Sequence, residues 1–189
     1  MNENSFLKDY FDKLNKLIKF DRETINKLIE CKKTLISAKS KGGKTLIFGN
    51  GGSAAIASHF SVDLTKNAKV RCVNFNEADL ITCFSNDFGY DRWVEKAIQY
   101  YADEGDNLIL ISASGESMNM VNAAQEAKRS KIKNIITFTG NLKNNTLSKM
   151  GNVNFWVNSK SYNLIENVHQ ILLLSLVDLI IGKSEYKPN

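Results

Sequence analysis

Apolar and polar residues follow two patterns along this chain, one typical of helices and one typical of strands. Over residues 5–40 the apolar positions recur at helical spacing, and Asp21, followed by Glu23, is placed to cap a second helix. We expect two helices, or one bent helix, in an N-terminal helical part (residues 1–41). Short apolar and β-branched runs then predict strands at 45–48, 70–76, within 106–117, at 135–139 and at 153–157.

Helical patterns separate these strands. One follows a glycine turn at 49–52, and a short helix is expected in the connection at 76–82; others lie at about 91–102, from 117 to about 129 and from 163 to about 181. This alternation predicts an α/β fold with an open parallel sheet that binds ligands at the carboxyl ends of its strands. We expect a single domain over residues 1–189, with an α/β core at 42–183 and a loose polar tail at 184–189.

The last predicted helix is apolar almost all round, with Leu164, Ile165, Val168, Leu172 and Leu176 among its residues. A surface helix of a monomer would show a polar half. We therefore expect its own sheet and another subunit to bury this helix, so that the protein is a homo-oligomer.

Composition narrows the class of protein. The chain has 189 residues, of which 43% are hydrophobic and 24% charged, as in soluble globular domains with their own core. Three cysteines without metal-like spacing argue against a disulfide framework, and neither a leader nor a membrane span is predicted, so we expect a cytoplasmic protein. The net charge of +5 is scattered, without a basic stripe, so an anionic small molecule is a better partner than nucleic acid.

A glycine turn joins the first predicted strand to a helix that Ser53 can cap. A helix that begins in such a turn leaves unpaired N–H groups, which suit an anion. The sequence at 49–53 is neither a Walker A loop nor a dinucleotide fingerprint. Taken alone, it is better explained as a tight turn that binds nothing.

A serine turn follows the strand within 106–117 in the same way. Ser112, Ser114 and Ser117 surround Gly115 directly before a helix. Three hydroxyls exceed what an N-cap requires, so we interpret this turn as an anion site suited to phosphate. A polar loop at 84–90 holds Asn86 and Asp87, which are predicted to cap the helix at 91–102.

Both histidines of the chain have a carboxylate on the same predicted helix face. Asp63 follows His59 by four residues, and Glu166 precedes His169 by three. In isolation, such a pair is most simply a histidine held by a carboxylate on a solvated face. Two converging pairs would supply a general base, a general acid or ligands for a zinc-like ion.

Together these motifs resemble the sugar isomerase (SIS) domain family in order and spacing. They read Gly-Asn-Gly-Gly-Ser-Ala-Ala from residue 49, Ser-Asn-Asp-Phe-Gly from 85, Ser-Ala-Ser-Gly-Glu-Ser from 112 and Glu-Asn-Val-His from 166. Over essentially its whole length the chain is similar to the phosphoheptose isomerases of that family. The resemblance implies a three-layer sandwich with a five-stranded parallel sheet, assembled as a homotetramer with sites between subunits.

The resemblance also implies an activity. It is the conversion of sedoheptulose 7-phosphate to D-glycero-D-manno-heptose 7-phosphate through an enediol, for the heptose of bacterial surface polysaccharide. It assigns substrate binding to Asn50, Gly51, Gly52, Ser53, Asn86, Asp87, Ser112, Ala113, Ser114, Ser117 and Glu166. It places proton transfer on Asp63 with His59, Glu166 or His169, and a zinc ion on His59, Asp63 and Glu166.

Ile56 and Glu116 depart from the pattern of that family, and three further departures concern the residues expected to do the chemistry. Asp63 stands where the family has glutamate, Glu166 where it has glutamine, and Leu174 where it has a catalytic, zinc-binding histidine. Leucine neither transfers a proton nor binds zinc. The alternative is therefore a non-catalytic relative that binds a phosphosugar or a protein partner, like the family's replication-initiator-binding member, which also lacks that histidine. A different phosphosugar as substrate is a third hypothesis.

Overall fold

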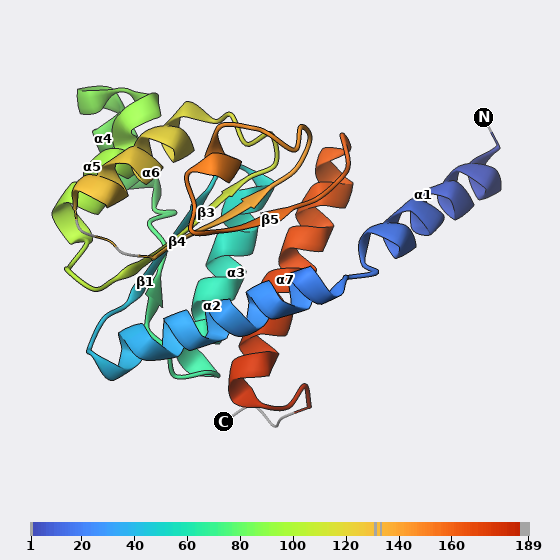
Figure 1. Ribbon diagram of the computed structural model, residues 1–189. Coiled ribbons are helices and arrows are strands. Elements are labelled where there is room, and N and C mark those ends of the chain that lie inside the picture. The colour runs from blue at the N-terminus through green and yellow to red at the C-terminus, as the bar shows by residue number, and fades with distance from the viewer. Residues whose placement is uncertain (1, 131, 133, 186–189) are drawn as a thin grey trace.

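The computed structural model describes residues 2–130, 132 and 134–185, which form an α/β sandwich of three layers (Figure 1). Five parallel strands lie in the order β2-β1-β3-β4-β5. The strands are β1 (Thr45–Gly49), β2 (Cys72–Val73), β3 (Asn107–Ser112), β4 (Asn134–Thr139) and β5 (Val153–Trp156). The helices are α1 (Glu3–Leu17), α2 (Arg22–Ser40), α3 (Gly52–Lys66), α4 (Ala78–Phe88), α5 (Trp93–Tyr101), α6 (Met118–Arg129) and α7 (Tyr162–Ile181), with short 3-10 helices η1 (Tyr90–Arg92) and η2 (Leu147–Lys149).

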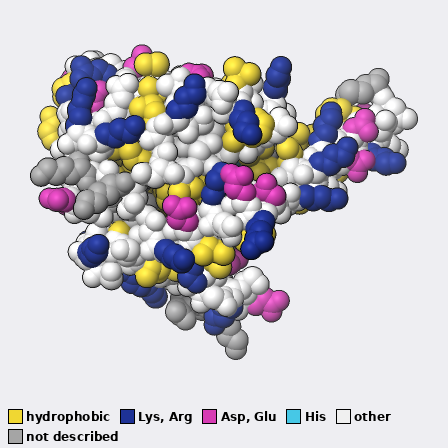
Figure 2. All heavy atoms as spheres, in the orientation of Figure 1, with side chains coloured by type: hydrophobic (Ala, Val, Ile, Leu, Met, Phe, Trp, Pro, Cys, Tyr) yellow, Lys and Arg dark blue, Asp and Glu magenta, His cyan; other side chains and the backbone are white. Residues whose placement is uncertain are grey.

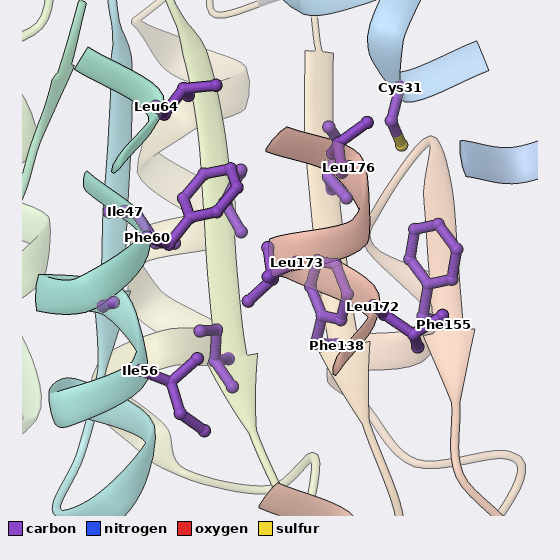
Figure 3. Packing of buried hydrophobic residues seen from close by; sticks show 14 of the residues in the cluster. Cys31, Ile47, Ile56, Phe60, Leu64, Phe138, Phe155, Leu172, Leu173 and Leu176 are labelled. Atoms are coloured by element: carbon purple, nitrogen blue, oxygen red, sulfur yellow. The ribbon is translucent and has the colours of Figure 1, made fainter. Parts of the chain in front are cut away.

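Helices cover both faces of the sheet. Alternate side chains of a strand point to opposite faces of the sheet, so each strand contributes side chains to two hydrophobic cores. One core joins the sheet to α2, α3 and α7 and contains Ile47, Phe60 and Leu173 (Figure 3). The other joins it to α5 and α6 and contains Phe48 and Leu110. Burial on both faces explains why the strands appear in the sequence as unbroken apolar runs.

The N-terminal part consists of two helices. Asp21 caps α2 as predicted, because its Oδ1 accepts a hydrogen bond of 2.8 Å from the Thr24 N–H. The helix before it, α1, extends away from the body, and charged side chains cover much of the side seen in Figure 2. None of its described residues is buried, and Phe6, Leu7 and Phe11 are each about half exposed. The outer part of α1 thus leaves an apolar stripe exposed in the single chain.

Two predictions between residues 70 and 90 were wrong. The strand expected at 70–76 is only two residues long, because the Asn74 and Asn76 side chains turn to α3 and donate to Ser61 Oγ and the Ala54 carbonyl. The expected loop at 84–90 lies mostly in α4 (Ala78–Phe88), whose apolar positions recur at helical spacing across the polar residues. Gly89, with φ of +85°, ends this helix.

The last helix agrees with the prediction and forms part of the core layer against α3 and α2. Within the described residues it is the one helix long and apolar enough to cross a membrane. Core helices of soluble proteins have the same composition, and 44% of the apolar window is buried inside this fold. Of the tail expected at 184–189, residues 186–189 lie outside the described part of the chain.

A buried carboxylate ties together the amino ends of β1 and β3. Asp106, 1% exposed, accepts hydrogen bonds from the Lys44 and Asp103 N–H groups and from Lys44 Nζ. Asp106→Ala should therefore lower the free energy of unfolding by about 2 to 4 kcal/mol in urea titrations. Asp103→Asn is the control, since exposed Asp103 binds the same ammonium group, and it should change stability little. Equal effects of the two variants would contradict this prediction.

Candidate functional site

The candidate site lies at the carboxyl ends of β1 and β3. These neighbours run in register, with Gly49 opposite Ile111, and the chain proceeds from them to opposite sides of the sheet. Parallel sheets bind ligands at such a point. A cavity of about 250 Å³ opens there, lined by Asn50, Gly51, Gly52, Ser53, Ile111, Ser112, Ala113, Ser114, Ser117, Tyr162 and Glu166. All residues expected to bind substrate line it, except Asn86 and Asp87.

The serine turn supplies hydroxyl and N–H donors to one side of this cavity. Ser112 Oγ lies 3.0 Å from Ser117 Oγ and accepts a hydrogen bond from the Gly115 N–H. Gly115 has φ of +71°, and a Cβ there would overlap Asn145, so this turn requires glycine. Helix α6 begins after Ser117 without a side-chain cap, which leaves N–H groups of its first turn for an anion.

Glu116, in the middle of this turn, does not oppose an anion. Its carboxylate turns away and accepts hydrogen bonds from Thr146 Oγ1 at 2.7 Å and the Thr146 N–H at 2.8 Å. These bonds lower the pKa of Glu116. Its charge is thus used to hold the loop before η2 against the serine turn.

The glycine turn supplies the opposite side of the cavity. Gly51, with φ of +54°, precedes the first residue of α3. The prediction that Ser53 caps this helix was wrong: Ser53 lies in the first turn, buried, with Oγ 3.4 Å from Glu166 Oε1. A Cβ on Gly52 would collide with the Glu166 carboxylate, so glycine at this position makes room for the acid.

Glu166 stands between two cavities. It lines the first cavity with the serine turn, and it lines a second one, of about 510 Å³, with His59 and Gln170. Within the described residues, it is the only charged side chain that lines the first cavity. The tertiary structure thus places one carboxylate in the same cavity as the serine turn.

His59 and Asp63 share one face of α3, as the spacing predicted. His59 Nε2 lies 3.3 Å from Asp63 Oδ2, and His59 Nδ1 lies 3.4 Å from Gln170 Nε2. The imidazole, with a side chain 48% exposed, is therefore oriented by a carboxylate on one side and an amide on the other. Asp63 is not among the described residues that line either cavity, and it adjoins the second cavity through its contact with His59.

The expectation that His169 is catalytic was wrong. His169 is fully buried, with Nε2 3.1 Å from the Thr139 carbonyl oxygen and its ring against Phe138. Burial lowers its pKa to about 4. Although the two residues share one face of α7, His169 packs into the core against β4 while Glu166 lines the cavity.

Asn86 and Asp87 lie apart from the cavity of their own chain. They occupy the last turn of α4, both exposed, with Asn86 Nδ2 donating to Asp87 Oδ1 at 2.9 Å. They cap no helix, contrary to the prediction, because α4 continues through them. Sugar binding by these residues within one chain is not supported.

One chain does not assemble the expected zinc site. Among the described residues, no three His, Cys, Asp or Glu side chains lie close enough together to hold a metal ion. His59 and Asp63 form one pair, and Glu166 faces Ser53 instead. Leu174 lines an apolar groove with Tyr10, Phe11 and Leu14 of α1 and adds no ligand.

Sequence reasoning missed three polar residues of the site. Tyr162 lines the first cavity, Gln170 holds His59, and Asn119 is hydrogen-bonded to Asn50. The sequence does contain an indication that Asn119 belongs to the site, since this polar residue lies on the apolar side of a helix that begins at the serine turn. For Gln170 the sequence offers no comparable signal.

Burial of His169 should make stability depend on pH. Its pKa is about 4 in the folded protein, against 6.5 for the free side chain, so the unfolded chain binds more protons between these values. Stability present above pH 6.5 is lost as pH falls towards 4. In urea titrations, the wild type should lose about 2 kcal/mol more than His169→Leu between about pH 7 and 4.5. Parallel pH profiles for the two proteins would refute this.

Comparisons with known proteins show which family this chain is similar to. The sequence pattern of the SIS domain family matches residues 9–140. The phosphoheptose isomerase of Buchnera aphidicola is 34% identical over 160 residues, which are 81% of this chain and 81% of that protein. The phosphoheptose isomerase of Thermodesulfovibrio yellowstonii is 30% identical over 184 residues, 94% of this chain and 90% of that protein.

Solved structures show the same fold. A phosphoheptose isomerase from Francisella tularensis superimposes with a TM-score of 0.85 at 27% identity, covering 97% of this chain and 100% of that one. The phosphoheptose isomerase from Neisseria gonorrhoeae superimposes with a TM-score of 0.86 at 24% identity, covering 95% and 98%. The five-stranded parallel sheet and its flanking helices are therefore those of these enzymes.

Proposed function

Because this chain belongs to the SIS domain family and has phosphoheptose isomerases among its relatives, we propose that it is an aldose–ketose isomerase of a phosphorylated sugar, converting sedoheptulose 7-phosphate to D-glycero-D-manno-heptose 7-phosphate. One observation carries the proposal: an anion-binding serine turn and a single carboxylate, Glu166, line the same cavity. A phosphosugar isomerase needs both, a phosphate holder and a base at the far end of the sugar.

The cavity suits transfer of a proton between neighbouring carbons. Glu166 removes the proton from the hydroxyl-bearing carbon beside the carbonyl, which gives an enediol, and returns it to the former carbonyl carbon. The carbonyl oxygen gains a proton as the neighbouring hydroxyl loses one. His59, oriented by Asp63 and adjoining the same carboxylate, exchanges these oxygen-bound protons. N–H groups at the start of α3 stabilise the developing negative charge on oxygen.

The test is turnover of sedoheptulose 7-phosphate by the purified protein in D₂O, followed by NMR. An enediol route should place deuterium on the carbon next to the new carbonyl, because the carboxylate exchanges its proton with solvent. Parallel samples with chelator and with zinc report any need for metal. Isomerisation without deuterium would contradict exchange of the carboxylate proton with solvent, and absence of turnover would refute the isomerase.

A non-catalytic phosphosugar-binding protein is the second candidate. Leu174 favours it, since this position lines an apolar groove with residues of α1 and offers no proton-transfer group. Binding of sedoheptulose 7-phosphate without turnover would identify this function. Neither binding nor turnover would indicate a protein partner instead.

We further propose that the protein is a homotetramer that works in the cytoplasm, where the product would supply heptose for surface polysaccharide. The exposed apolar stripe of α1 and the groove beside Leu174 support assembly, because both leave apolar surface uncovered in one chain. Sedimentation equilibrium of the purified protein should give a molecular mass of four chains. A monomer at micromolar concentration would contradict the assembly.

A further inference from the structure

The side chain of Asn50, in the glycine turn, is clamped by two other residues. Its Nδ2 donates to Asn119 Oδ1 at 3.0 Å, and its Oδ1 accepts from Asn119 Nδ2 at 2.8 Å. Asn50 Oδ1 also accepts a hydrogen bond of 3.0 Å from the Tyr90 hydroxyl. Asn119 lies in the first turn of α6 and is 2% exposed, whereas Tyr90 lies in η1 with its ring half exposed. One amide thus connects three segments of the chain.

The backbone of α6 fixes the direction of this amide pair. Two paired carboxamides could exchange their oxygen and nitrogen atoms without losing their mutual bonds. Here the Met120 N–H donates to Asn119 Oδ1 at 3.1 Å, so that atom must be the oxygen. The atom of Asn50 that faces it must then be the nitrogen. The Tyr90 hydroxyl, donating to the remaining oxygen, completes the same polarity.

Among the described residues, this polarity leaves one N–H group of Asn50 without a hydrogen-bond partner. The carboxamide nitrogen has two N–H bonds, of which Asn119 takes one, while the oxygen already accepts two hydrogen bonds. Asn50 lines the cavity together with the serine turn. It therefore offers the cavity a hydrogen-bond donor and has no acceptor left to offer.

We infer that Asn119 and Tyr90 are positioning residues, which orient Asn50 so that it presents an N–H donor to an oxygen of the sugar. This inference rests on the proposed binding of a phosphosugar. It adds how the sugar is recognised: the clamp selects an oxygen that accepts a hydrogen bond, such as the substrate carbonyl or its enediolate. Because Asn119 lies in the first turn of the helix that follows the serine turn, the clamp also sets the spacing between the sugar and phosphate halves of the cavity.

Two variants with matched controls test the clamp. Asn119→Ala removes the paired amide, and Gln125→Ala removes an exposed amide from the same helix. Tyr90→Phe removes only the hydroxyl, and Tyr100→Phe does so at another exposed ring. Calorimetry measures the Kd of sedoheptulose 7-phosphate and of inorganic phosphate for each protein. The sugar phosphate should bind about tenfold more weakly to Asn119→Ala and about threefold more weakly to Tyr90→Phe, while phosphate affinity stays within about twofold.

The outcomes separate this inference from the isomerase. Absence of turnover with the expected affinity changes refutes the activity and supports the clamp. Equal weakening of both ligands would mean that Asn119 only supports the fold, which overturns the inference. Unchanged affinity of Asn119→Ala for the sugar phosphate would also overturn the inference. A wild type that binds inorganic phosphate but not the sugar phosphate would overturn it as well. In the free protein, the Asn50 carboxamide proton that faces Asn119 should exchange slowly with solvent, and Asn119→Ala should abolish this protection. Fast exchange of both carboxamide protons in the wild type would refute the clamp.

Discussion

Glu166→Gln should lower kcat for sedoheptulose 7-phosphate by about 10²- to 10⁴-fold while leaving KM within a small factor. The two side chains have nearly the same shape, so Ser53 and Gly52 keep their neighbour. An amide cannot take a proton from carbon at neutral pH, whereas the carboxylate can. Progress curves by NMR measure the effect directly.

The control for this variant is Glu104→Gln, since Glu104 is exposed and does not line the cavity. It should retain full turnover. Retained turnover by Glu166→Gln would move the base to another group, with Asp63 as the next candidate through His59. A large rise in KM at unchanged kcat would instead make Glu166 a binding residue.

The second large effect is expected at the serine turn. Ser112→Ala combined with Ser114→Ala should weaken binding of the phosphosugar at least about 100-fold, because each hydroxyl is lost as a partner of a charged phosphate. Within the described residues no lysine or arginine lines this cavity, so no cation compensates for the loss. Calorimetry with sedoheptulose 7-phosphate measures the change.

Folding of this double variant needs its own measurement, since Ser112 Oγ accepts the Gly115 N–H and its loss weakens the turn. Thermal unfolding shows whether the protein is intact. Ser40→Ala, at the exposed end of α2, is the matched control and should bind normally. An intact double variant with wild-type affinity would show that the phosphate is held elsewhere.

Local pattern was a good guide where one element decides the outcome. The strands and helices of the core were predicted because apolar spacing reflects burial within each element, and β1 and β3 are buried on both faces. The prediction failed at β2, where asparagine side chains bind α3 and the strand ends after two residues. It also failed at α4, where a run of polar residues was predicted to be a loop but is helical. At β2, contacts of the asparagine side chains with α3 end the strand early. At α4, the polar side chains face solvent from a helix that the apolar residues hold in place.

The two histidines show the limit of local pattern most clearly. His59 and His169 each have a carboxylate three or four residues away, so the local pattern predicts the same role for both histidines. One is half exposed between Asp63 and Gln170, and the other is fully buried against a backbone carbonyl. Their difference depends on which side of a helix meets the sheet, which residues distant in the chain determine.

By itself, the sequence determined the order of strands and helices, the two turns that precede α3 and α6, and the resemblance that joins them into one family. These features depend on residues close together in the chain. Only the tertiary structure decided that Glu166 faces the serine turn, that His169 belongs to the core, and that Asn119 holds Asn50. Each of these depends on contacts between residues far apart in sequence, because parallel strands bring the starts of separate helices to one edge of the sheet.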